Sequence, residues 1–239
     1  MTTHWHIPKG VKIAFSTRQT GVSKAPYKSL NLGLHVGDVR ADVLENRALI
    51  SERLNLPSLP AWLDQIHSIK VVEADNQSLA CADASYTRQK QQVCVVMTAD
   101  CLPVLVCDKK GEQVAAIHAG WRGLCDGIIE TTLNKFAAKR SDLIAYLGPA
   151  IGPEAFEVGE EVREMFMLLH PDTSAFFNST ESDGKFLADL QGLAKYRLQL
   201  AGVNQVYQSN VCTYKNEADY FSYRRDGITG RMASFIWLT

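Results

Sequence analysis

The sequence lacks a dominant charge of either sign, and it lacks any long hydrophobic run. Its 239 residues carry 25 Lys and Arg against 26 Asp and Glu, a formal net charge of −1. A chain so balanced has no long-range field for attracting nucleic acid or an anionic membrane, so we expect neither as a partner. Apolar runs such as 93–97 and 114–117 are far shorter than the roughly 20 residues that a membrane span requires.

The sequence also lacks closely paired cysteines. Its six cysteines are Cys81, Cys94, Cys101, Cys107, Cys125 and Cys212. No two of them form a Cys-x-x-Cys pair, which argues against a zinc ribbon or a thioredoxin-type redox motif. The opening Met1 to His6 has no basic segment followed by an apolar stretch. We therefore expect a cytoplasmic protein with free thiols, most of them buried as packing residues.

Apolar runs and helical stripes are distributed along the whole chain. The runs lie at 13–17, 71–74, 93–98, 104–107, 114–118, 144–147, 203–207 and 233–238. Most are apolar throughout, which predicts strands covered on both faces. The stripes, at 43–54, 124–136, 162–169 and 187–201, predict helices. With no linker or internal repeat, we expect a single domain spanning 1–239, with a mobile loop at 171–185.

Two of the predicted strands end in chemically reactive residues. The first is followed by Asp100 and Cys101, and the second ends at His118 beside Gly120. Because Pro103 cannot donate a ladder hydrogen bond, we expect Cys101 to lie at a break in the strand. Each residue alone is more often structural, but together at strand ends they form a candidate catalytic pair, Cys101 and His118.

His67, in a polar break before the strand at 71–74, is a third candidate. Two imidazoles and one thiolate suit zinc, and three protein ligands leave a fourth position open for water, which zinc activates as a nucleophile. The same ligand set occurs in copper sites with an axial methionine, and Met97 is close in sequence. Copper is the less favoured metal, because six histidines in all are too few for the additional copper cluster of a multicopper oxidase.

At these residues the chain resembles a known family. Segments 98–103 (Thr-Ala-Asp-Cys-Leu-Pro) and 118–123 (His-Ala-Gly-Trp-Arg-Gly) are similar to signatures of the bacterial YfiH-type family. Further similar segments include 31–33, 45–47, 65–67, 147–152, 221–227 and 230–231, so the resemblance covers essentially the whole chain. Members of the family are described as laccase-domain polyphenol oxidases, as peptidoglycan editing factors, and as purine nucleoside phosphorylases with adenosine deaminase activity.

The resemblance implies an architecture, a metal site and an activity. The implied fold is a single α+β domain of layered mixed β-sheets flanked by helices (αββα-like), related to a toxin with a Cys/His hydrolase site. The implied metal ligands are His67, Cys101 and His118. The implied activity is a zinc-dependent purine nucleoside phosphorylase with adenosine deaminase activity. The even charge balance and the lack of an exposed amphipathic repeat lead us to expect a monomer. The alternatives are a Cys101/His118 hydrolase of an amide such as a peptidoglycan precursor, a copper-dependent polyphenol oxidase, and a metal-bearing binding module without enzymatic activity.

Nucleoside phosphorolysis needs an anion clamp, a pocket for a flat base and an acid or base. The predicted substrate-binding residues are Asn31, Arg47, Arg122 and Arg225, with Arg224 as a further arginine and Trp121, Phe221 and Tyr223 as stacking candidates. Arg47 stands on the expected buried face of its helix, either with its charge reaching water or as a half-buried arginine that awaits an anion. Asp83 and Asp100 are the candidate proton-transferring acids, and either could instead cap a turn.

Overall fold

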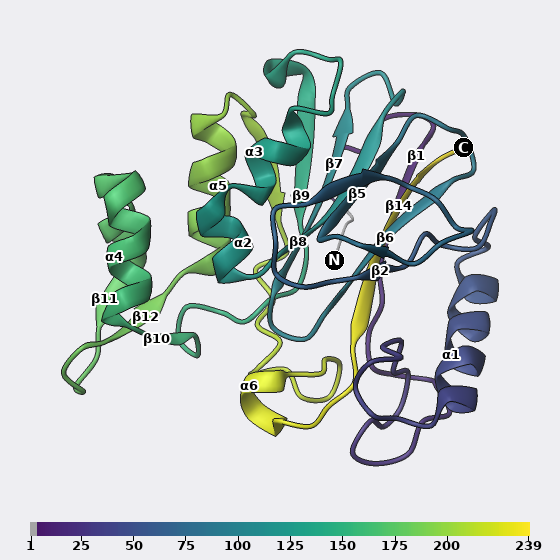
Figure 1. The fold of residues 1–239 in the computed structure, drawn as a ribbon, viewed down its shortest axis with the longest axis horizontal. Helices are drawn as coiled ribbons and strands as arrows, with labels where there is room; N and C mark the ends of the chain where they lie inside the picture. The colour runs from purple at the N-terminus through teal and green to yellow at the C-terminus, as the bar shows by residue number, and fades with distance from the viewer. Residues whose placement is uncertain (1–3) are drawn as a thin grey trace.

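Apolar strands build two sheets that pack face to face (Figure 1). The structure is a computed structural model that describes residues 4–239, so the prediction for the opening segment falls partly outside the described residues. The larger sheet has the order β13 (Gln205–Gln208), β9 (Leu143–Leu147), β7 (Leu102–Asp108), β8 (Val114–Ala119), β5 (Ala84–Thr87), β3 (Val71–Glu73). The smaller sheet is antiparallel, with the order β1 (Val11–Phe15), β14 (Met232–Leu238), β6 (Val93–Thr98).

Alternate residues of these strands enter different cores, which explains the continuous apolar runs. In β7, Leu105 and Cys107 face the core between the two sheets, whereas Val104 and Val106 belong to the core on the opposite face. Every side chain of β6, β7 and β8 is accordingly buried. The prediction of strands covered on both faces is confirmed.

Helices cover the outer face of each sheet. α2 (Trp121–Asp126), α3 (Ile128–Leu133) and α5 (Leu190–Leu200) cover the larger sheet, and α1 (Arg40–Arg53) packs Ile50 against the smaller one (Figure 1). The resulting layers are helix, sheet, sheet and helix, as the family resemblance implied. The stripe predicted at 124–136 is divided between two helices, because Gly127 takes the left-handed φ of 99° where α2 ends.

A small outlying unit lies beyond the helical layer (Figure 1). It comprises β10 (Glu157–Gly159), α4 (Glu160–Leu169), β11 (Phe177–Ser179) and β12 (Lys185–Ala188). The prediction of a loop at 171–185 was wrong, since this segment holds a 3₁₀ helix, Pro171–Phe176, and a strand paired with β12. The polar, turn-forming residues of this segment are typical of a loop, but here they belong to a short hairpin of β11 and β12. Residues 187–188 also belong to β12, so the fifth helix starts later than its stripe predicted.

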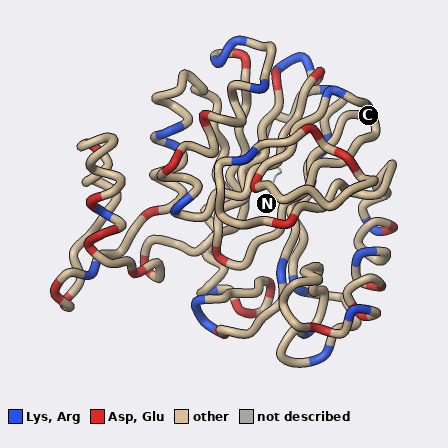
Figure 2. Tube along the Cα trace, viewed as in Figure 1, with Lys and Arg blue, Asp and Glu red and all other residues tan. Residues whose placement is uncertain are grey.

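Short elements complete the fold. They are β2 (Leu63–Asp64), β4 (Ala80–Cys81), a 3₁₀ helix at Arg140–Asp142 and α6 (Tyr223–Asp226). Positive and negative side chains are interspersed along the trace (Figure 2), so capture of an anion would depend on local side chains. Among the described residues, no helix has the length and apolar character needed to cross a membrane.

Candidate metal centre and its cavity

Three side chains from separate segments meet at the end of the sheets. The candidate ligand atoms of His67, Cys101 and His118 all lie within 4.8 Å of one another. The Cys101 Sγ lies 3.7 Å from the His67 Nε2, and the two imidazole rings meet edge to face with centroids 4.7 Å apart. The fold thus brings together residues whose sequence spacing gave a weak signal.

The position of Cys101 follows from the way the chain crosses between sheets. β6 belongs to the smaller sheet and β7 to the larger one, and Cys101 lies in the turn between them, where Asp100 has the left-handed φ of 89°. Cys101 therefore directly precedes β7, which agrees with the break expected from Pro103. His118 lies in β8, where it pairs with Pro103 of β7. A Cβ on Gly120 would approach the His67 ring to 2.7 Å, so the trio requires glycine there.

Asp83 organises both histidines. Its Oδ1 accepts hydrogen bonds from the His118 Nδ1 at 2.8 Å and from the backbone N–H of His67 at 2.9 Å. Its Oδ2 accepts from the backbone and hydroxyl of Ser68, at 2.6 and 2.7 Å, and from the backbone of Ile66 at 3.3 Å. These bonds hold His67 in its left-handed conformation, with φ of 61°. Asp83 is completely buried and does not line the cavity, so it fixes the ligands and does not face substrate.

The charges of these groups are coupled. Burial alone would raise the pKa of Asp83, but hydrogen bonds from His118 and Ser68 lower it to about 2. Burial opposes the charged form of His118, yet Cys101 and Asp83 raise its pKa to about 9. Burial likewise opposes the Cys101 thiolate, and His118 and His67 nevertheless lower its pKa to about 6. Without a metal, Cys101 and His118 thus form a thiolate–imidazolium pair at neutral pH.

The donor set fits zinc. In a tetrahedral site with Zn–S of about 2.3 Å and Zn–N of about 2.0–2.1 Å, sulfur and nitrogen are about 3.6 Å apart, close to the 3.7 Å observed. The Nδ1 of His118 is engaged by Asp83, which leaves its Nε2 for the metal. The other thiols differ: burial raises the pKa of Cys94 and Cys107 to about 12, as expected of packing residues. All six cysteines are free.

The trio opens into a cavity of about 430 Å³, within the range of small-molecule sites. It is lined by His35, Gln65, His67, Met97, Thr98, Ala99, Cys101, His118, Tyr223 and Arg231. Of the predicted stacking residues, Tyr223 lines the cavity and is 60% exposed, whereas Phe221 is fully buried and Trp121 packs against the core.

The predicted substrate-binding residues lie outside this lining. Asn31 is completely buried, and Arg122 lies over the ring of its neighbour Trp121. Arg47 is half-buried, but its guanidinium stacks on Trp62 and donates to the Leu32 carbonyl. Burial and the nearby Arg40 lower the pKa of Arg47 to about 10.

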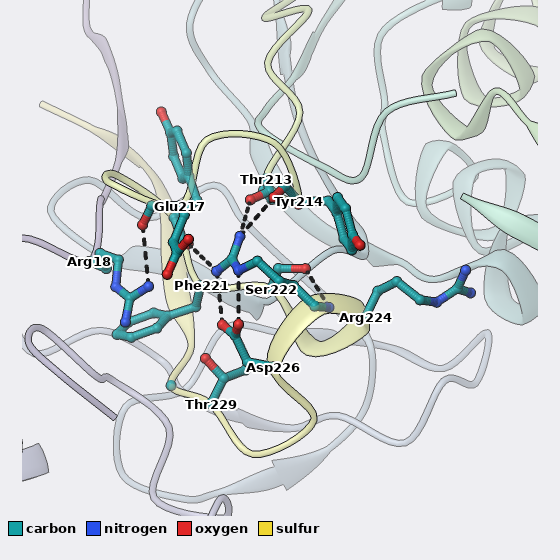
Figure 3. A network of polar contacts seen from close by, with 12 residues as sticks. Arg18, Thr213, Tyr214, Glu217, Phe221, Ser222, Arg224, Asp226 and Thr229 are labelled. Carbon is teal, nitrogen blue, oxygen red and sulfur yellow. Dashed lines mark hydrogen bonds and ion pairs between the residues drawn. The ribbon is translucent and has the colours of Figure 1, made fainter. Parts of the chain in front are cut away.

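Arg225 ties the C-terminal loops together. Its guanidinium pairs with Asp226 and donates to the carbonyls of Thr213, Tyr214 and Tyr220. Figure 3 labels Thr213, Tyr214 and Asp226, whose oxygens accept hydrogen bonds from this guanidinium. Each of its nitrogens already has a protein acceptor, so the arrangement supports the loop that carries Tyr223.

Asp100 is also a structural acceptor. Its carboxylate accepts from the hydroxyls of Thr213 and Ser222, at 2.7 and 3.0 Å, and from the backbone of Arg224 at 2.7 Å. It is 8% exposed and does not line the cavity. The capping interpretation of Asp100 therefore describes its contacts.

Three cavity residues escaped the sequence interpretation: His35, Gln65 and Arg231. Gln65 bonds the backbone of Met97 in both directions, donating to its carbonyl and accepting from its N–H. The available signal was their place in or near the family-like segments 31–33, 65–67 and 230–231, where only Asn31 and His67 had been given a role.

Comparison with known proteins identifies the family. A family model described as multi-copper polyphenol oxidoreductase laccase matches residues 12–239, nearly the whole chain. The chain belongs to this laccase-domain, or YfiH, family. The resemblance stated from the segments around Cys101 and His118 is thereby confirmed.

Relatives in the YfiH family match along their full length. Purine nucleoside phosphorylase YfiH of Shigella flexneri is 52% identical over 98% of this chain and 96% of its own length. A purine nucleoside phosphorylase of Pseudomonas aeruginosa is 46% identical over 100% of this chain and 98% of its own.

Solved structures of the YfiH family share the fold. A Neisseria meningitidis protein assigned to DUF152 has a TM-score of 0.94 and 47% identity, covering 98% of this chain and 96% of its own. YlmD of Geobacillus stearothermophilus has a TM-score of 0.87 and 32% identity, covering 96% and 92%. The α+β prediction is confirmed.

Proposed function

We propose that the protein is a zinc-dependent purine nucleoside phosphorylase that also deaminates adenosine. The observation that carries the proposal is the His67, Cys101 and His118 trio, which opens into a cavity whose wall also holds an arginine and an exposed tyrosine. The names of the relatives at 46–52% identity support the phosphorylase part. A zinc ion bound by the trio would supply a Lewis acid and an acidified water.

Phosphorolysis joins a phosphate oxygen to C1′ of the ribose and breaks the bond between C1′ and the purine nitrogen. The electron pair of the broken bond stays on the purine, which takes up a proton, and the sugar leaves as ribose 1-phosphate. The cavity offers Tyr223 as a platform for the flat base and Arg231 as a cation. Adenosine, inosine and guanosine all present these features.

Deamination exchanges the C6 amino group of adenosine for the oxygen of water and releases ammonia. The required proton transfers need a titratable group that faces the cavity, and neither Asp83 nor Asp100 does so. Outside the trio, the imidazole on the lining is His35. Partial burial and the charge of Arg231 lower the pKa of His35, so it is neutral at pH 7 and can accept a proton. We assign His35 this role.

A hydrolase of amides is the second candidate. The observation that favours it is the thiolate–imidazolium pair of Cys101 and His118, which is an activated nucleophile in the absence of metal. A peptidoglycan precursor is the amide of this hypothesis. A copper-dependent polyphenol oxidase is the third candidate, favoured by Met97 on the lining and by the description of the family. The monomeric state and the cytoplasmic location stay predictions.

The test is product analysis with protein of defined metal content. Zinc-loaded, copper-loaded and chelator-treated protein are each incubated with adenosine and inorganic phosphate, and the products are separated. We expect inosine, free purine and ribose 1-phosphate from the zinc-loaded protein alone.

Each alternative is tested on the same three forms of the protein with its own substrate, an amide such as a peptidoglycan precursor or a phenol. Turnover that resists the chelator, with a covalent adduct on Cys101, would establish the hydrolase and overturn the zinc proposal. Oxidation of a phenol by the copper-loaded form alone would establish the oxidase. Cys81→Ser, which changes an exposed thiol, is the matched control for modification of Cys101.

A further inference from the structure

We propose that Arg231 binds the phosphate co-substrate in the metal cavity and that Asn31 positions Arg231 for this task. The inference rests on the proposed function, because it assigns the anion subsite of that same reaction. It also gives a role to two family-like segments, 31–33 and 230–231.

The guanidinium of Arg231 is held at one end and available at the other. Its Nη1 donates to the carbonyls of Thr229 and Gly230, at 2.9 and 3.0 Å. Within residues 4–239, Nε and Nη2 have no hydrogen-bond partner, and no acidic side chain lies within ion-pair distance of Arg231. A guanidinium fixed by carbonyls, with two nitrogens left to donate, suits the oxygens of phosphate.

The charges around this cavity favour an anion beside Arg231. Burial lowers the pKa of Arg231, and Cys101 and Asp100 oppose that shift. Burial lowers the pKa of His35, the charges of Arg231, Arg47 and His118 lower it further, and Asp64 opposes them. Phosphate bound here would neutralise the half-buried charge of Arg231 while lying near the metal trio.

The segment that carries Arg231 is fixed by Asn31. The Asn31 Oδ1 accepts from the backbone N–H groups of Gly33 and Arg231, both at 2.9 Å, and its amide donates to Asp38 at 2.9 Å. A Cβ on Gly33 would approach the Cγ of Arg231 to 2.8 Å. Asn31 was predicted to bind substrate directly, but its contacts make it a positioning residue for the arginine that faces the cavity.

The other candidate arginines are less suited to this role. Every nitrogen of the Arg225 guanidinium already has a protein acceptor, and Arg47 lies on Trp62 behind the lining. Arg122 is exposed over Trp121. Among the residues that the structure describes, Arg231 is the arginine that lines the cavity.

A competing role for Arg231 is that of counter-charge to the Cys101 thiolate. In that case, removing its charge would raise the pKa of Cys101 and lower zinc affinity, without a specific effect on phosphate. The two roles are separated by measuring phosphate, nucleoside and metal in the same variants.

The experiment compares Arg231→Met and Arg231→Lys with the wild-type zinc-loaded protein. Arg88→Met, an exposed arginine at the opposite end of β5 from Asp83, is the matched control. We expect Arg231→Met to raise KM for inorganic phosphate by about tenfold or more, because charge-assisted hydrogen bonds to an anion are lost. Zinc content should stay at the wild-type value, and KM for inorganic phosphate should change more than KM for adenosine. Arg231→Lys keeps the positive charge but loses the forked guanidinium, so its KM for inorganic phosphate should lie between those of the wild type and Arg231→Met.

Direct titration of the zinc-loaded proteins with inorganic phosphate keeps the inference separate from the proposed function. If the wild type forms no ribose 1-phosphate, the proposed function fails, whereas the anion subsite is judged by phosphate binding that the Arg231→Met variant loses. Unchanged phosphate binding in a folded Arg231→Met or Arg231→Lys variant overturns the inference. A parallel loss of zinc would overturn it in favour of the counter-charge role. Asn31→Ala should weaken phosphate binding with zinc content retained, and Arg231→Met should add no further loss in that background.

Discussion

Two buried aspartates lie on either side of the candidate metal centre, and their surroundings differ. Asp83 accepts hydrogen bonds from the His118 ring and from the turn that carries His67. Asp100 accepts from Thr213, Ser222 and the backbone of Arg224. One carboxylate thus holds candidate metal ligands, and the other holds the loop that brings Tyr223 to the cavity. Sequence alone gave both the same role, that of a proton-transferring acid.

The role of a buried acid beside a reactive residue therefore follows from the groups that donate hydrogen bonds to it. Asp83 is bonded to an imidazole, so it changes the charge and tautomer of a ligand. Asp100 is bonded to hydroxyls and a backbone amide, so its contribution lies in loop geometry. Substitutions on the two sides should therefore affect different measurements.

The largest effect is expected from removing a ligand on the Asp83 side. In Cys101→Ser and His118→Ala, zinc content should fall to background, and turnover should fall by more than the roughly 10–100-fold typical of outer-sphere changes. Elemental analysis and product formation from adenosine plus phosphate measure both. Full zinc content in either variant would remove that side chain from the ligand set.

Asp83→Asn should come next. The amide keeps the shape but loses one acceptor oxygen, so the His118 ring is less firmly held and zinc affinity should fall by about 10–100-fold. Competition with a chromophoric chelator measures the affinity. An equal loss in Asp100→Asn would erase the distinction between the two aspartates.

Thiol reactivity sharpens the comparison through pH. In chelator-treated protein, His118 and His67 hold the pKa of Cys101 at about 6 against its burial, so alkylation of Cys101 should rise as the pH rises through about 6. Cys94 and Cys107, with pKa values raised to about 12, should stay unmodified at neutral pH.

The same alkylation profile separates the two aspartates. Asp83→Asn weakens the imidazolium that stabilises the thiolate, so the midpoint should move upward, towards the roughly 8.5 of an ordinary cysteine. Asp100→Asn should leave the pH midpoint of Cys101 alkylation unchanged. Peptide mass spectrometry after timed iodoacetamide treatment gives each midpoint, and a profile insensitive to Asp83 would contradict the coupling.

The smallest effect on the metal is expected from Asp100→Asn. Losing one acceptor leaves a buried donor on Ser222 or Arg224 unsatisfied, which costs about 1–3 kcal/mol of folding free energy. Tyr223 should then be held less firmly in the lining of the cavity. KM for adenosine should therefore rise, while zinc affinity changes by less than about twofold. Chemical denaturation, chelator competition and steady-state kinetics test this, and a large zinc loss is the contrary outcome.

Much of the fold could be predicted because strands in packed sheets have a recognisable apolar pattern in the sequence. Strands such as β6 and β8, buried on both faces, read as unbroken apolar runs. The hairpin of β11 and β12 was missed because its stability comes from pairing, not from local pattern. The single helix expected at 124–136 is divided at Gly127, where the backbone turns left-handed.

The site was predicted where chemistry is tied to residue type. His67, Cys101 and His118 stand out because few other roles suit two imidazoles and a thiol. The anion clamp that we propose could not be found in the same way, because arginines differ in function only by their partners. Arg225 is enclosed by acceptors and Arg231 is not, and that difference exists only in the folded chain.

The central claim, a zinc-dependent site built from His67, Cys101 and His118, is tested most directly by metal titration. Chelator-treated protein is titrated with zinc while bound metal and product formation from adenosine plus phosphate are followed together. We expect one zinc per chain in the wild type, with activity recovering in proportion, and neither in Cys101→Ser. Full turnover before zinc is added would contradict it.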